Sequence, residues 1–123
     1  MEENNIKKIE KTSLYERHLD LGAKINVFAN YQMPINYTNG IQSEYDAVRN
    51  DVALFDVSHM GVIKISGDKA SFFLNKILSN SILDIPSGKA IYSLLCNPNG
   101  GVIDDLIVYS IDGYFLLIVN ASN

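Results

Sequence analysis

The last third of the chain constrains the fold most, because three apolar runs are joined there by two tight turns. The runs are AIYSLLC at 90–96, VIDDLIVYSI at 102–111 and YFLLIVN at 114–120. NPNGG separates the first two runs, and Asp112-Gly113 separates the last two. Short turns connect antiparallel neighbours, and Asp-Gly is among the strongest hairpin signals in a sequence. We therefore predict an antiparallel meander of three strands.

The front of the chain predicts a short helix and a strand. Ser13 and Glu16 form a capping-box pattern, and Gly22 offers a stop, so a helix is expected over about 13–21. In the next run, apolar residues alternate at Ile25 and Val27, and Pro34 and the turn pair Asn39-Gly40 follow. This pattern indicates a short strand followed by a loop.

Two more helices and one more strand are expected between 41 and 80. Spacings of four, three and four residues place one set of apolar side chains on a single helix face: Ile41, Tyr45, Val48 and Val52. A strand follows at 61–66, and Asp68 is a natural N-cap for a third helix with the body KASFFLNKILSN. The prediction is an α+β fold in which helices flank antiparallel strands, with residues 1–11 as a flexible tail and 12–123 as the folded region.

Composition excludes several classes of protein. The net charge of −4 argues against nucleic-acid binding, because phosphate contacts need clustered Lys and Arg. No apolar run approaches the roughly 18 residues of a membrane span, and the amino terminus is too polar for a secretory signal, so we expect a cytoplasmic protein with no membrane partner. A single cysteine, Cys96, excludes an internal disulfide and a Cys-rich zinc site, and we expect a buried structural thiol and no metal.

Adjacent acids at 104 and 105 are the most unusual feature of the predicted sheet. Neighbours on a strand point to opposite faces. Alternation assigns the run to two faces: Ile103, Asp105, Ile107 and Tyr109 on one, and Val102, Asp104, Leu106 and Val108 on the other. Either acid costs free energy to bury unless it is paired or hydrogen-bonded. The acids either cap backbone groups at the wet end of a hairpin, or one of them recognises or protonates a nitrogen-rich ligand in a partly apolar pocket.

Histidine and tyrosine residues offer further candidates. His59 could transfer protons or bind metal, but the only other histidine, His18, lies on a different predicted element, so we favour a role in orienting a loop through backbone contacts. Four tyrosines could wall a pocket for a flat heterocycle or could belong to the core: Tyr31, Tyr37, Tyr92 and Tyr109.

Several motifs in order resemble one family. They are KTSLYERHLDLGA at 11–23, MPINY at 33–37, AVRNDVALFDVSHMG at 47–61, YSLLCNPNGGVIDDLIVY at 92–109 and VNASN at 119–123. Together they resemble the amino-terminal stretch of glycine-cleavage T-proteins, the folate-dependent aminomethyltransferases. One departure is Asn30-Tyr31, which stands where relatives usually have a Gly-Trp pair.

The resemblance implies a reaction and a set of site residues. An aminomethyl group carried on the lipoyl arm of the H-protein would pass to tetrahydrofolate, releasing ammonia and forming methylene-tetrahydrofolate. Asp105, the second acid of the pair, would be the catalytic group near the reacting folate nitrogens. The folate pocket implied by the resemblance also takes Met60, Tyr92, Ile107, Tyr109 and Asn120.

The resemblance also implies that the chain is a truncated amino-terminal part of the aminomethyltransferase folate-binding fold. Family members are considerably longer, and further pocket residues would lie beyond Asn123. Two alternatives stay open: a folate-binding relative of the iron-sulfur assembly type without transferase activity, and an inactive fragment. Retention of DDLIVY at 104–109 favours the transferase.

Overall fold

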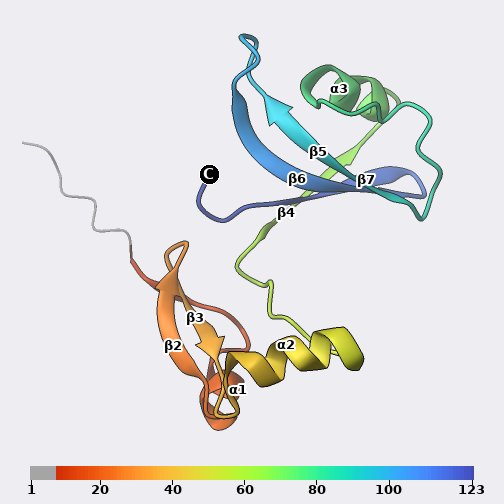
Figure 1. Cartoon of the computed structure of the whole chain (residues 1–123). Helices are drawn as coiled ribbons and strands as arrows, with labels where there is room; N and C mark the ends of the chain where they lie inside the picture. The colour runs from red at the N-terminus through yellow and green to blue at the C-terminus, as the bar shows by residue number, and fades with distance from the viewer. Residues whose placement is uncertain (1–7) are drawn as a thin grey trace, which may run out of the picture. The chain divides into compact units, whose positions relative to one another are not determined.

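The computed structural model describes residues 8–123 and consists of two compact units. The first unit ends at His59 and the second begins at Met60. Figure 1 shows the elements of both units, which are described separately below. In the part of the chain that the structure describes, no helix is long and apolar enough to cross a membrane.

The first unit is built on a small three-stranded sheet. Its elements are β1 (Glu10–Lys11), α1 (Tyr15–Asp20), β2 (Lys24–Phe28), β3 (Tyr31–Asn36) and α2 (Gly40–Asn50). The strand order is β1-β3-β2, in which β1 runs parallel and β2 antiparallel to β3. Glu10 and Lys11 lie in the segment predicted as a tail, yet the Glu10 amide donates to the Asn30 carbonyl at 2.8 Å. Residues 1–7 of that predicted tail lie outside the described residues.

The prediction of a loop after β2 is wrong, because β3 forms there and makes a hairpin. Phe28 pairs with Tyr31, so the connection has only two residues, and both have positive φ: Ala29 at 48° and Asn30 at 66°. That conformation matches the right-handed twist of paired strands. Pro34 is tolerated because β1 reaches only Gln32, so at Pro34 one edge of β3 faces no neighbouring strand among the described residues.

Two predicted helix caps are also wrong, although the helices themselves form. The residue before α1 is Leu14, which makes no capping bond, and Glu16 instead accepts a hydrogen bond from Lys11 at 3.3 Å. Helix α3 (Ala70–Ile77) likewise follows Lys69 without a side-chain cap, so Asp68 is not its N-cap. At the start of α3, the Ala70 amide instead donates a backbone hydrogen bond to the Gly67 carbonyl at 2.9 Å.

Helix α2 does not turn its predicted apolar face towards the sheet of the first unit. Its most deeply placed residues include Glu44 and Ala47, and the Glu44 carboxylate accepts a hydrogen bond from the Tyr37 amide at 2.8 Å. The predicted apolar face is exposed: Ile41, Tyr45, Val48 and Val52. The periodicity therefore located the helix but not the side that contacts β3.

The second unit is a four-stranded antiparallel sheet with α3 over one face (Figure 1). Its strands are β4 (Gly61–Ser66), β5 (Ala90–Cys96), β6 (Val102–Ile111) and β7 (Tyr114–Val119), in the order β4-β7-β6-β5. The predicted meander and the strand at 61–66 are confirmed, and β4 closes the sheet by pairing with β7. The core between α3 and the sheet consists of Leu74, Leu78, Ile82, Leu106, Val108 and Leu117.

Candidate functional site

Strand β6 separates its residues onto two faces, as alternation predicts. The face packed under α3 carries Asp104, Leu106, Val108 and Ser110, all buried. The other face, which we call the open face, carries Ile103, Asp105, Ile107 and Tyr109, all exposed. Cross-strand partners share a face, so the pairing of Tyr92 with Ile107 places Tyr92 on the open face too.

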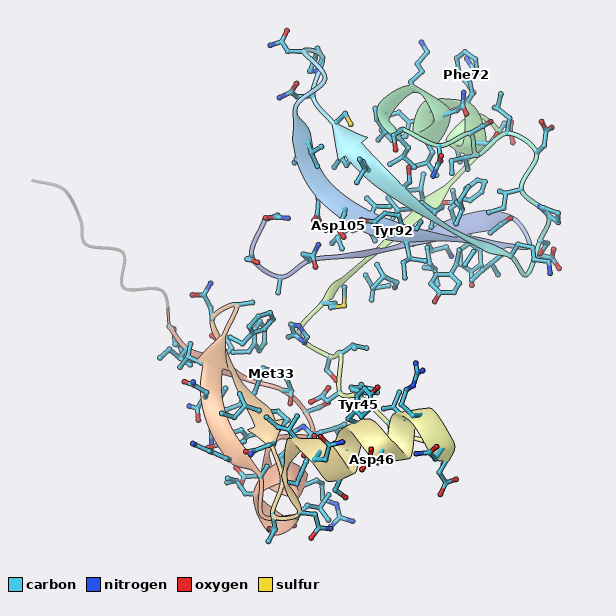
Figure 2. The ribbon with its side chains drawn as sticks, in the orientation of Figure 1. Met33, Tyr45, Asp46, Phe72, Tyr92 and Asp105 are labelled. Atoms are coloured by element: carbon cyan, nitrogen blue, oxygen red, sulfur yellow. The ribbon has the colours of Figure 1, made fainter. Side chains whose placement is uncertain are left out.

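Asp105 is held by two side chains on this face. The Tyr92 hydroxyl donates to Asp105 Oδ2 at 2.9 Å, and Asn120 Nδ2 donates to Asp105 Oδ1 at 2.8 Å. Figure 2 shows Tyr92 and Asp105 next to each other on β5 and β6. The hydrogen bond to Asp105 raises the pKa of the Tyr92 hydroxyl, with smaller contributions from burial and from the charge of Asp105. Tyr92 therefore stays protonated and donates at neutral pH.

The remaining predicted pocket residues belong to the same sheet. Ile107 and Tyr109 lie on the open face, 38% and 41% exposed, where they offer an apolar and an aromatic surface. Met60 directly precedes β4, whose first residue pairs with Val119. Continuing that register brings Met60 opposite Asn120, at the same end of the sheet as Asp105. One carboxylate bordered by an aliphatic and an aromatic side chain can accept hydrogen bonds from a nitrogen-rich heterocycle lying on the sheet.

Asp104 is the buried member of the acid pair, and no partner for it was predicted from the sequence. Its side chain accepts hydrogen bonds from Asn120 N at 3.1 Å, Asn120 Nδ2 at 2.7 Å and Asn123 Nδ2 at 2.6 Å. Burial tends to raise the pKa of Asp104, but these bonds outweigh it and lower that pKa. The residues that satisfy Asp104 come from the chain after β7, and strand alternation alone carries no signal for them.

A second buried network lies in the first unit and was also missed. Asp56 Oδ2 lies 2.8 Å from His18 Nε2 and accepts from the Thr12 hydroxyl at 2.7 Å, while Asp56 Oδ1 accepts from the Ser58 amide at 2.9 Å. Burial tends to raise the pKa of Asp56, but the bonds from His18, Ser58 and Thr12 hold it well below its usual range. On its other side, His18 Nδ1 lies 2.8 Å from the Tyr37 hydroxyl. Burial raises the pKa of that hydroxyl, and the charges of Glu44 and Asp56 add to the effect.

His59 belongs to the first unit, and Cys96 lies outside the open face of β6. His59 packs edge-on against Phe28 and Tyr31, with ring centroids 5.7 and 6.2 Å away. Its Nδ1 is buried without a hydrogen-bond partner among the described residues. Cys96 is half-buried at the end of β5, so the expectation of a buried thiol is met only in part. In residues 8–123, no three His, Cys, Asp or Glu side chains gather as a metal site would require.

Comparison with known proteins gives a consistent picture. Residues 14–123 match the family described as the GCVT N-terminal domain. The chain is 47% identical to an aminomethyltransferase of Thermotoga maritima and 49% identical to one of Staphylococcus epidermidis, each over 116 residues. Each match covers 94% of this chain and 32% of the relative, so the chain spans about a third of the length of these relatives.

A solved structure agrees with these relatives. It is the glycine cleavage system aminomethyltransferase T from Bartonella henselae, with a TM-score of 0.88 and 37% sequence identity. The similarity covers 94% of this chain and 32% of that one. The α+β architecture described above is therefore the one found in that third of the Bartonella protein.

Proposed function

Since this chain belongs to the GCVT N-terminal domain family, we propose that it serves as the amino-terminal part of an aminomethyltransferase of glycine cleavage. In the proposed reaction, an aminomethyl group carried by the lipoylated H-protein is transferred to tetrahydrofolate, ammonia is released and methylene-tetrahydrofolate is formed. The observation that carries the proposal is the open face of the second unit, where Asp105 is held between Tyr92 and Asn120.

The residues of the open face fit tetrahydrofolate as the acceptor. A pterin carries several N–H donors in a flat ring, and the Asp105 carboxylate supplies an acceptor beside an aromatic and an apolar surface. When bound, tetrahydrofolate would supply the nitrogens that accept the transferred carbon. We propose that Asp105 contacts these nitrogens and that Tyr92 and Asn120 orient its carboxylate. Met60, Ile107 and Tyr109 would bind the flat ring and keep water away from the reacting carbon.

The decisive experiment measures aminomethyl transfer from loaded H-protein to tetrahydrofolate by the full-length enzyme that carries this chain. We expect Asp105→Asn to lower kcat by roughly 100-fold or more, because it removes a positioned acid-base group while keeping its shape. The matched control is Asp112→Asn, which alters an exposed acid in the β6–β7 turn and should leave turnover unchanged. Near-normal turnover of Asp105→Asn would refute the catalytic assignment.

The same assay separates the transferase from a folate-binding relative without transferase activity. A wild-type protein that binds tetrahydrofolate but transfers no aminomethyl group would support the iron-sulfur assembly type of relative. The names of the relatives at 47% and 49% identity favour the transferase. The cytoplasmic location stays a prediction from the sequence.

For the 123-residue chain alone, we expect weak or absent tetrahydrofolate binding. Tyr92 is 56% exposed and Asp105 is also exposed, so the open face of this unit lacks the enclosing walls that ligand pockets usually have. Isothermal titration calorimetry with tetrahydrofolate checks this. Tight binding at one site per chain would contradict the prediction.

A further inference from the structure

The amide group of Asn120 joins the two acids of β6. Its Nδ2 lies 2.7 Å from Asp104 Oδ1, 2.8 Å from Asp105 Oδ1 and 3.0 Å from the Asp105 carbonyl oxygen. Asp104 lies on the covered face of the strand and Asp105 on the open face, so one side chain reaches acceptors from both residues. Asn120 is therefore fixed from the buried side and makes its contact on the exposed side.

The buried acid determines which end of the amide faces the acid pair. An ionised carboxylate only accepts hydrogen bonds, whereas an asparagine amide has a donating and an accepting end. Asp104 is 6% exposed and also accepts from the backbone amide of Asn120, which brings residue 120 close to it. Because both carboxylates require a donor, Nδ2 points to the acids, and Oδ1 points away from them.

A second asparagine also donates to Asp104 but does not reach Asp105. Asn123 Nδ2 donates to the same Oδ1 atom at 2.6 Å, and no hydrogen bond joins the Asn123 side chain to Asp105. The turn after β7 therefore folds back onto Asp104 through two asparagines, of which only Asn120 continues to Asp105. This difference makes Asn123 a matched control for Asn120.

We propose that Asp104 is a positioning residue for the site: its buried carboxylate fixes the Asn120 amide, which holds Asp105 in one orientation and turns the Asn120 Oδ1 acceptor away from the acids. Asp104 itself does not touch the ligand. This inference rests on the proposed function of Asp105, and it adds that the first acid of the pair acts on the reaction only through Asn120.

The first test needs no variant. In the 123-residue chain, NMR of a sample with labelled asparagine side chains reports hydrogen exchange at each amide. We expect the Asn120 amide protons to exchange at least tenfold more slowly than those of the exposed Asn39. Equal exchange rates would show that the amide is not fixed, and would overturn the proposal.

The second test is a double-mutant cycle in the full-length enzyme, assayed for aminomethyl transfer. Asp104→Asn keeps the shape but allows either end of the Asn120 amide to face it, so kcat should fall about tenfold or more. The KM for loaded H-protein should stay unchanged. Asn123→Ala removes a donor to Asp104 without touching Asp105, and should stay within about twofold of wild type. Thermal melting of each variant shows whether the fold is retained.

The cycle is completed by Asn120→Ala alone and combined with Asp104→Asn. If Asp104 acts through Asn120, the double variant should be no slower than Asn120→Ala. Independent losses that multiply would overturn the positioning role, and so would wild-type kcat in a folded Asp104→Asn. The Asp105→Asn variant distinguishes the two proposals. If Asp105→Asn keeps normal turnover, the proposed function is refuted. If Asp105→Asn loses turnover while Asp104→Asn keeps it, only the positioning role is refuted.

Discussion

At the residue scale, two buried acids depend on partners that lie far away in the sequence. Asp56 is bonded to Thr12 and His18, 44 and 38 positions earlier. Asp104 is bonded to Asn120 and Asn123, 16 and 19 positions later. A buried carboxylate is tolerated only when hydrogen bonds replace the water it loses. Removing a partner should therefore cost far more than removing a surface ion pair.

We expect His18→Ala to lower the free energy of unfolding of the first unit by about 3 kcal/mol, because it leaves Asp56 buried without its main partner. Urea titration followed on the amide NMR signals of β2 and β3 measures the change. The control is Asp20→Asn in the same helix, which removes the exposed pair with Arg17. That change should cost at most about 0.5 kcal/mol. Equal losses in the two variants would contradict a structural role for the His18–Asp56 pair.

At the element scale, the β2–β3 hairpin depends on an uncommon turn. Both of its central residues have positive φ, which costs a residue with a Cβ atom about 1 kcal/mol. Asparagine adopts this conformation more readily than alanine, so Asn30 suits its position and Ala29 does not. Asn30 thus places a residue that tolerates the left-handed region at the second position of this turn.

We expect Ala29→Gly to stabilise the first unit by about 0.5–1 kcal/mol, because glycine adopts a φ of 48° without the Cβ clash. Ala47→Gly in the middle of α2 is the control of opposite sign, and should destabilise by a similar amount. Thermal denaturation of the two variants beside wild type checks both signs. A loss of stability in Ala29→Gly would mean that the turn is not strained.

At the scale of the whole molecule, the two units are stabilised in different ways. The second unit has an apolar cluster of six buried side chains between α3 and its sheet. In the described part of the first unit, Met33 is the only buried apolar side chain, and the other buried side chains are polar: Thr12, His18 and the carboxylate of Asp56. Burial of apolar surface is the main favourable term in folding, so the first unit should be the less stable of the two.

Acid should therefore unfold the first unit before the second. The pKa values of Asp56 and Asp104 are lower in the folded chain than the value of about 3.9 in the unfolded chain. The stability that each gives is complete above that unfolded pKa, and is lost as the pH falls towards the folded pKa. Urea midpoints at pH 7, 5 and 3, followed by NMR in each unit, should change little from 7 to 5 and fall by pH 3. They should fall first for β2 and β3, and a midpoint independent of pH down to 3 would contradict this.

The arrangement of the candidate side chains on one face of the sheet could be predicted from local patterns. Alternation placed Asp105 with Ile107 and Tyr109, and the meander brought Tyr92 to the same face. The loop at β3 and the two side-chain caps were mispredicted, because pairing with β2 and backbone bonds outweighed the local preferences of Pro34, Ser13 and Asp68. The exposed apolar side of α2 shows the same limit, since periodicity identifies a face but not what it contacts.

The sequence by itself determined the strands β5 to β7, the turns between them and the division of the two acids onto opposite faces. These follow from the two-residue repeat of a strand and from the backbone freedom of turn residues, which are local properties. Only the tertiary structure decided which face α3 covers, and hence that Asp104 is the buried acid and Asp105 the exposed one. It also decided that Asn120 returns to Asp104 and that His18 meets Asp56, because such contacts depend on packing between distant segments.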